Sequence, residues 1–340
     1  MTTSKKLLTA ACTAALATLS AGAHAQISGG VVKIGVLTDL SGTYSDLAGS
    51  GAVLATKMAV EDFIAKEKPT FKIEVVSADH QNKADIASNK AREWFEREGV
   101  DMILDVPNSA VALAVNDVAK SLNKVMVNGS AGTTRLTGDA CTPNTVHWTF
   151  DNFALANGTG SAVVQTGGDT WFFITVDYAF GKQWQEDATK FITAAGGKVL
   201  GTSLHPLNSN DFSSQLLQAQ ASGAKVIVLA NSGSDLANAL KQAKEFGIVG
   251  SKQRIAPLGI LINAVHGIGL DATQGLVISA AAYWNANDET RAFTKRYNAA
   301  FGNRMPNESQ LVTYSAVNHY LKSVKAANTL DGQAVMAKMR

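Results

Sequence analysis

Short apolar runs rich in β-branched residues alternate with segments of helical period from residue 31 onward. In the first half of the chain, this pattern predicts strands at residues 31–37, 71–78, 100–106 and 125–128. The apolar positions between these runs recur at helical spacing, which predicts helices at residues 51–66, 83–97 and 109–122. Such alternation is typical of βαβ units built around a parallel sheet.

The same alternation repeats in the second half of the chain. It predicts strands at residues 171–176, 198–204, 226–230, 254–262 and 276–281, and helices at residues 180–195, 212–221 and 235–246. Two more helices are predicted at residues 288–301 and 308–327. The sequence therefore predicts an α/β fold of two Rossmann-like lobes, each with a parallel central sheet, joined by a hinge.

The change from the first set of elements to the second indicates crossovers near residues 145–150 and 281–284. We expect a first lobe formed by residues 28–149 and 282–326, and a second lobe formed by residues 150–281 and 327–340. The last predicted helix, at residues 332–340, has no C-terminal glycine and no strand after it, so we expect the chain to continue beyond this point.

The first 25 residues have the pattern of a cleaved export signal. Lys5 and Lys6 precede an apolar run at residues 7–19, and residues 23–25 (AHA) form a small-x-small cleavage pattern. A lipoprotein leader cut before Cys12 would leave too short an apolar segment, and the Thr, Ser and Gly content of the run disfavours a membrane anchor. We expect a mature, soluble protein in the periplasm.

The charge balance argues against a nucleic-acid partner. The chain has 30 basic and 28 acidic side chains, and Lys5 and Lys6 lie in the leader, so the mature chain is predicted to be neutral. A neutral chain lacks the positive field that attracts a phosphate backbone.

Removal of the leader would leave Cys141 as the only cysteine in this sequence, so no intrachain disulfide is predicted. Stability must then come from the apolar core. Two interpretations of this thiol stay open: a buried, inert side chain, or a partner cysteine in a stretch that this sequence lacks.

No motif for a cofactor, a metal or catalysis stands out. Residues 38–51 follow the first strand with glycines at the wrong spacing for a dinucleotide turn and without a P-loop lysine. The six histidines are scattered and form no metal-binding pattern. Residues 128–132 (NGSAG) approach a serine nucleophile elbow, but Asn128 replaces the first glycine and no triad partner is evident. We expect no cofactor, no metal site and no enzymatic activity.

Small polar residues follow two predicted strands of the first lobe. Asn108 and Ser109 lead into a helix, where either side chain would cap it and leave backbone N–H groups facing outward. Thr133 belongs to a stretch of glycine, serine and threonine at residues 129–134, directly after the next strand. Because the carboxyl ends of parallel strands line a common crevice, we expect a carboxylate site here. A plain turn or cap is the alternative for each stretch alone.

Aromatic residues follow the first predicted strand of each lobe. Tyr44 does so in the first lobe, and Tyr178 and Phe180 do so in the second. Such rings form flat apolar walls, and the two tyrosines also carry a hydroxyl group. They either enclose a ligand or pack against their own neighbours.

Three segments together carry a resemblance to a known family. They read KIGVLTDLSG at residues 33–42, SAGTTRLT at residues 130–137 and DYAFG at residues 177–181. The sequence resembles the type I periplasmic solute-binding proteins of ABC transporters, the branched-chain amino-acid receptor family, over nearly all of the mature chain. The resemblance implies a monomeric two-lobe clamp with three hinge crossovers, which closes on a small ligand and presents it to a membrane permease.

The resemblance also implies roles for individual residues. Ser109, the backbone of Ala131 with the adjacent Gly132, and Thr133 would hold the ligand carboxylate, next to the cap at Asn108. The body of the ligand would lie between aromatic rings of the two lobes, and Asn231 would add a polar contact after a second-lobe strand. The aromatic residues in question are Tyr44, Tyr178 and Phe180.

One departure from the family pattern bears on the ligand. Amino-acid-binding relatives have an acidic residue where this sequence has Leu261, and that residue pairs with the ligand ammonium. A buried, unpaired ammonium costs several kcal/mol, so the ligand is predicted to lack an amine. We expect a carboxylate with an apolar or aromatic body, such as a benzoate-like, phenylpropenoate-like or branched oxo acid.

Other interpretations stay open. Asp39 or Asp177 could reach an ammonium from another direction, which would restore branched-chain amino acids as ligands. A sensor ectodomain for small ligands and an extracellular enzyme are the alternatives from other functional classes.

Overall fold

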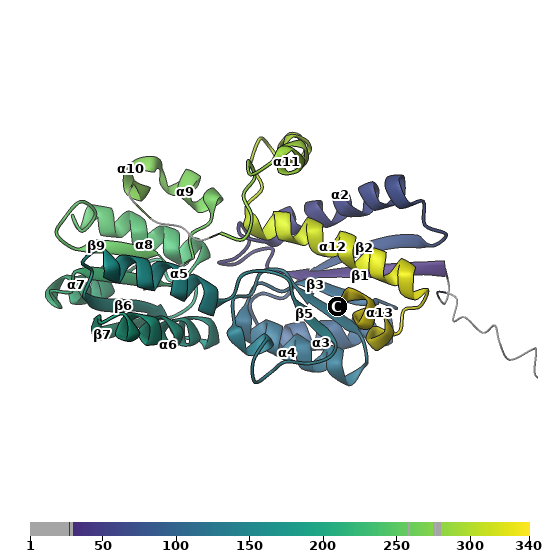
Figure 1. Ribbon diagram of the computed structural model, residues 1–340, viewed down its shortest axis with the longest axis horizontal. Coiled ribbons are helices and arrows are strands. Elements are labelled where there is room, and N and C mark those ends of the chain that lie inside the picture. Colours follow the sequence, from purple (N-terminus) through teal and green to yellow (C-terminus); the bar gives the residue numbers. More distant parts are fainter. Residues whose placement is uncertain (1–26, 28–29, 258, 275, 277–279) are drawn as a thin grey trace, which may run out of the picture.

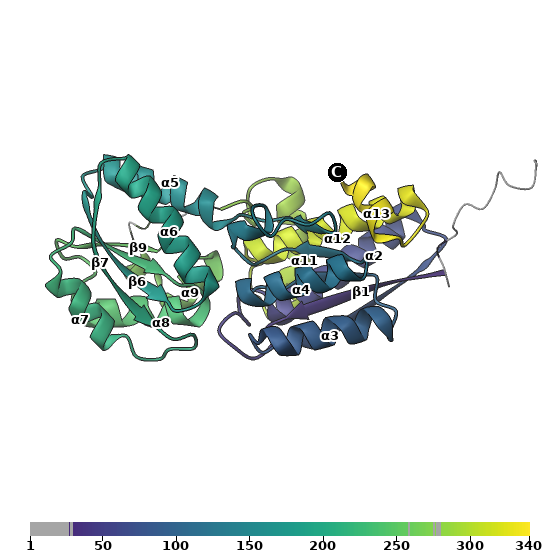
Figure 2. The ribbon, with the colours of Figure 1, turned by 90° about the horizontal axis from the view of Figure 1, so that it is seen from below.

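The computed structural model describes residues 27, 30–257, 259–274, 276 and 280–340, and the predicted leader at residues 1–25 lies outside this part. Two α/β lobes lie side by side along the long axis of the molecule (Figures 1 and 2). Each lobe has its own parallel sheet with helices on both faces. The predicted fold class is therefore confirmed.

The first lobe is built on a five-stranded parallel sheet in the order β2-β1-β3-β4-β5. Its strands are β1 (Val31–Thr38), β2 (Lys72–Asp79), β3 (Met102–Asp105), β4 (Val125–Asn128) and β5 (Thr145–His147). One face is covered by α3 (Ala84–Glu96) and α4 (Ser109–Ser121), and the other by α2 (Gly49–Glu67) and α12 (Glu308–Ala327). Because both faces are covered, β3 and β4 are buried at every position.

The second lobe is built on a four-stranded parallel sheet in the order β7-β6-β8-β9. Its strands are β6 (Thr170–Val176), β7 (Lys198–His205), β8 (Val226–Ala230) and β9 (Arg254–Pro257). One face packs against α5 (Asn152–Gln165) and α6 (Ala179–Ala194), and the other against α7 (Ser213–Ala221), α8 (Gly233–Glu245) and α9 (Ile262–Ile268). The short α10 (Leu270–Thr273) follows α9.

Segments of the second lobe differ from the sequence-based predictions. Helix α5 was not predicted, because its glycines and polar residues obscure the apolar period. The strand predicted at residues 254–262 ends at Pro257, which has no N–H for a further ladder bond, and α9 begins at its predicted last residue. The strand predicted at residues 276–281 falls mostly outside the described residues.

The chain returns to the first lobe after the second. Helix α11 (Asp288–Ala300) packs against α2, and α12 lies beside α2. The expectation that residues 327–340 belong to the second lobe is wrong. Helix α13 (Gly332–Met339) buries Val335, Met336 and Met339 in the core beneath the first sheet, because these apolar side chains share one helix face.

Cys141 is exposed and free in the structure, so the interpretation as a buried thiol is wrong. The residue lies after the short 3-10 turn at Thr134–Leu136, outside the apolar core. Within the described part of the chain, no helix has the length and apolar character needed to cross a membrane.

Candidate functional site

The carboxyl ends of the two sheets face each other across a cleft, and side chains from both lobes meet there. The loop after β1 supplies several of the first lobe's contacts. Thr43 O accepts a hydrogen bond from the backbone N–H of Ser234 at 3.1 Å, and Asn263 Nδ2 donates to Asp46 Oδ2 at 2.7 Å. The lobes are therefore in contact, as in a closed clamp.

Two of the predicted aromatic residues bridge the cleft directly. The hydroxyl oxygens of Tyr44 and Tyr178 lie 2.6 Å apart, within hydrogen-bond distance. Burial raises the pKa of both hydroxyls above the usual value, so both stay protonated at neutral pH. A tyrosine pair of this kind can donate to a ligand oxygen as well as to its partner.

The aromatic wall of the second lobe extends beyond the predicted pair. The ring of Phe180 lies 6.0 Å from that of Tyr178 and 4.8 Å from that of Trp184, measured between ring centroids. Sequence reasoning did not find Trp184, although it lies four residues after Phe180 on α6 and so shares its helix face. The three rings form one continuous apolar surface.

The polar residues before α4 divide between two roles. The Asn108 side chain caps the helix by accepting from the N–H groups of Ala110 at 3.0 Å and Val111 at 3.2 Å. The Ser109 hydroxyl is buried and has no hydrogen-bond partner within the described part of the chain. Its backbone N–H lies beside the Tyr178 hydroxyl and partly offsets the pKa rise caused by burial. Asn108 is therefore engaged in the cap, whereas the Ser109 hydroxyl is unpaired among the described residues.

The backbone that leads into α4 is strained. Asp105 and Val106 have φ values of 83° and 55°, in the left-handed region that side chains rarely adopt. A left-handed backbone conformation costs more free energy at a β-branched residue such as Val106. The turn brings Pro107 to the wall of the cleft.

The stretch after β4 packs against the second lobe. The Ala131 N–H donates to Asn128 Oδ1 at 3.1 Å, so this predicted carboxylate donor is engaged within its own loop. A Cβ at Gly132 would lie 2.5 Å from Asn152 Oδ1 and 3.2 Å from the Phe180 ring, which explains the glycine. Thr133 is buried and accepts from Arg135 N at 3.4 Å. Gly132 O accepts from Asn152 N at 2.7 Å, so this stretch lies beside the first crossover.

The side chains at the centre of the cleft leave a small cavity of ≈ 20 Å³, about the room of one water molecule. Of the predicted residues, Tyr44, Tyr178, Phe180 and Leu261 line this inner cavity. Its remaining walls come from Leu47, Pro107, Ser130, Phe150, Trp184, Ser232 and Gly259. Asn231 is not among its lining residues, and the buried Asn231 Nδ2 instead pairs with His205 Nε2 at 3.0 Å.

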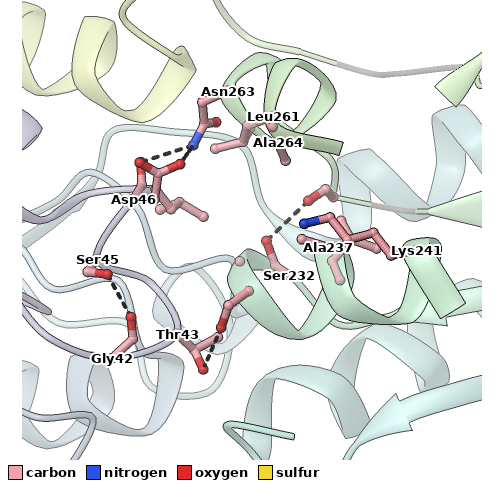
Figure 3. Close-up of a pocket in the computed structure, with 16 residues that line it drawn as sticks. Gly42, Thr43, Ser45, Asp46, Ser232, Ala237, Lys241, Leu261, Asn263 and Ala264 are labelled. Atoms are coloured by element: carbon pink, nitrogen blue, oxygen red, sulfur yellow. Dashed lines mark hydrogen bonds between the residues drawn. The ribbon is translucent and has the colours of Figure 1, made fainter. Parts of the chain in front are cut away.

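A second, larger pocket of ≈ 230 Å³ lies between the lobes (Figure 3). We call it the outer pocket. It is lined by the loop after β1 (Gly42, Thr43, Ser45, Asp46, Leu47), the start of α8 (Ser232, Gly233, Ser234, Leu236, Ala237, Lys241) and the region of α9 (Gly259, Leu261, Asn263, Ala264, Gly267). Leu47, Ser232, Gly259 and Leu261 also line the inner cavity, so the two spaces are neighbours.

Acidic groups near the cleft are engaged elsewhere. Asp39 accepts hydrogen bonds from Gly42 N at 2.7 Å, Tyr44 N at 2.8 Å and Asn82 Nδ2 at 2.6 Å, which order its own loop. Asp177 pairs with Lys182 at 2.7 Å. Neither side chain lines the inner cavity, and its described walls contain no carboxylate.

Two buried carboxyl groups lie behind the cleft walls. Asp105 accepts a hydrogen bond from Ser130, and burial raises its pKa to about 6. Asp235 accepts from Asn208 N at 3.2 Å and from Thr43, and burial raises its pKa to about 7. These groups tie loops together. Among the described residues, no cluster of three or more His, Cys, Asp or Glu side chains could hold a metal ion.

Two α/β lobes that close over a cleft lined from both sides define a solute-binding receptor of the clamp class. Residues 31–340 match the model of a family described as periplasmic binding protein, and the chain belongs to that family. It is a type I member of the branched-chain amino-acid receptor group, which confirms the resemblance seen in the sequence. The protein is thus a substrate-binding protein of an ABC transporter.

Solved structures and a curated relative support this placement. A periplasmic binding protein from Burkholderia mallei is 51% identical with a TM-score of 0.88, and the match covers 92% of this chain and 82% of that one. A branched chain amino acid ABC transporter periplasmic ligand-binding protein from Burkholderia xenovorans LB400 is 38% identical with a TM-score of 0.77, over 90% and 82%. The Leu/Ile/Val-binding protein homolog 6 of Brucella melitensis is 25% identical, over 85% and 74%.

Proposed function

We propose that this substrate-binding protein captures a carboxylic acid that has an apolar or aromatic body and no amine. The observation that carries the proposal is the composition of the inner cavity. Its described walls hold five aromatic side chains, two of them tyrosines, beside Leu47 and Leu261, and no carboxylate to pair with an ammonium. Ser109 and the tyrosine pair supply donors for the acid group.

The missing counter-charge favours a ligand without an amine on energetic grounds. An ammonium buried without a partner costs several kcal/mol, and each ~1.4 kcal/mol is a factor of ten in affinity. Asp39 and Asp177 were the candidates to pair with a ligand ammonium, but both already pair with other groups of the protein. Moving either to a ligand would break those contacts.

Capture works by a shift of population between open and closed lobes. The closed arrangement is held by direct contacts between the lobes, among them the tyrosine pair, the bond from Ser234 to Thr43 and the bond from Asn263 to Asp46. A ligand that separates Tyr44 from Tyr178 and touches both lobes would add to these contacts and favour closure. The closed form would then be the one that the membrane permease recognises, with the protein acting as a monomer in the periplasm after cleavage of the leader.

A thermal-shift panel tests this proposal. We expect benzoate, phenylpropenoate or a branched oxo acid to raise the unfolding midpoint, because a ligand that binds only the folded state stabilises it by mass action. Recovery of the same acid from the denatured complex, identified by its mass, would show that the protein does not alter its ligand. A response to leucine alone would overturn the amine-free proposal.

Branched-chain amino acids are the second candidate. They are favoured by the names of the relatives from Burkholderia xenovorans and Brucella melitensis. For this candidate to hold, an acidic group would have to enter the inner cavity when the ligand binds.

A further inference from the structure

The outer pocket contains a lysine whose charge plays no part in the capture of a simple mono-acid. Of its described lining residues, Lys241 and Asp46 carry full charges. Asp46 is already neutralised, since Arg304 Nη1 lies 2.9 Å from its Oδ1 and Asn263 Nδ2 lies 2.7 Å from its Oδ2. Lys241 makes no ion pair within the described part of the chain. The outer pocket therefore carries an uncompensated positive charge.

The position of Lys241 suits a ligand between the lobes. The residue lies two turns into α8, and its side chain runs from the helix toward the Ser232 side of the pocket (Figure 3). The first turn of α8 also lines the pocket, with Ser232, Gly233 and Ser234. Because a helix N-terminus has positive partial charge, both the helix and the lysine favour a negatively charged ligand group.

The two spaces can be occupied by one molecule. Leu47 and Leu261 line both the inner cavity and the outer pocket, so an apolar segment would pass between them. The volumes of ≈ 20 Å³ and ≈ 230 Å³ together approach the ~300 Å³ at which small-molecule sites begin. The inner cavity alone is far smaller than that.

We propose that the outer pocket is a second subsite, in which Lys241 binds a distal acidic group of the ligand. The preferred ligand is then a di-acid. Its first carboxylate lies near Ser109 and the tyrosine pair, and its apolar or aromatic middle passes between Leu47 and Leu261. Its second acidic group reaches Lys241. This inference rests on the proposed function and narrows its ligand class.

Matched pairs of acids test the subsite by calorimetry. Hexanoate and adipate share a six-carbon chain, and 3-phenylpropanoate and 3-(4-carboxyphenyl)propanoate share an aromatic middle, so each pair differs by one carboxylate. We expect the di-acid of at least one pair to bind about five- to tenfold more tightly than its mono-acid, with an advantage that shrinks as salt is raised.

The variant Lys241→Gln should remove that advantage and leave the affinity for the mono-acid within about twofold. Lys244→Gln is the matched control, because Lys244 lies on the same helix, outside the lining of the outer pocket, and its nearest acidic partner is Asp271 at 4.0 Å. Equal affinity for mono- and di-acids in the unmodified protein would overturn the subsite while the proposed function stands. An equal loss in both lysine variants would also overturn it. Failure to bind either kind of acid would instead contradict the proposed function itself.

Discussion

A single added carbon atom at Gly233 should hinder closure of the two lobes. Gly233 begins α8 with φ +65°, and a Cβ built there would lie 2.2 Å from the carbonyl oxygen of Thr43 on the opposite lobe. Ordinary contact begins near 3.4 Å. The substitution Gly233→Ala therefore requires the lobes to separate at this point by roughly 1 Å.

That separation has a definite cost. The bond from Ser234 N to Thr43 O, now 3.1 Å, would lengthen beyond hydrogen-bonding range. Loss of one such bond costs about 0.5–1.5 kcal/mol. Because the bond exists only when the lobes are closed, the closed population and the ligand affinity should both fall by roughly two- to tenfold.

Gly223 supplies the matched control. It also has φ +65°, in the loop before β8, but a Cβ there would meet nothing within 4 Å. Both alanine variants carry a similar backbone strain of about 1–2 kcal/mol, so both should lower the unfolding midpoint. Calorimetry should show weaker ligand binding for Gly233→Ala alone. Equal affinities of the two variants would refute the idea that closure brings Gly233 against Thr43.

Three further variants test other parts of the account. Tyr178→Phe removes the hydroxyl that meets Tyr44 and should weaken acid binding by about three- to tenfold in calorimetry, with little change in unfolding. Leu261→Glu places a carboxylate at the inner cavity and should shift preference toward ligands with an amine, measured as a ratio of dissociation constants for leucine and its oxo acid. Glu308 accepts from Ala281 N, and burial raises its pKa from 4.5 to about 7, so the fold loses stability as pH rises between these two values. The free energy of unfolding should therefore fall as pH rises from 5 to 8, and Glu308→Gln should flatten this slope by up to about 3 kcal/mol; an unchanged slope would contradict the assignment.

Much of the fold could be predicted from the sequence because its pattern is repetitive and strong. The strands Val125–Asn128 and Val226–Ala230 were predicted to the residue, since a parallel strand covered on both faces is an unbroken apolar run. Helix α5 escaped prediction because its burial depends on the second sheet rather than on its own period. The placement of α13 likewise depends on a tertiary contact that periodicity cannot specify.

The candidate site could be predicted only in part. Tyr44, Tyr178, Phe180 and Leu261 lie together at the inner cavity, since each follows a strand end and strand ends meet at the cleft. Ala131 was expected to be a free donor, but the side chain of Asn128 takes its N–H, a contact set by loop conformation. The larger outer pocket is lined by residues of both lobes, so no local sequence pattern could predict it.

Calorimetric titration of the purified protein with 4-methyl-2-oxopentanoate and with leucine tests the central claim most directly. The two molecules share a carboxylate and a branched apolar body, and they differ at the carbon that carries either an oxo group or an ammonium. With no carboxylate among the described walls of the inner cavity, the oxo acid should bind at least about a hundredfold more tightly than leucine. Tighter binding of leucine would contradict the account.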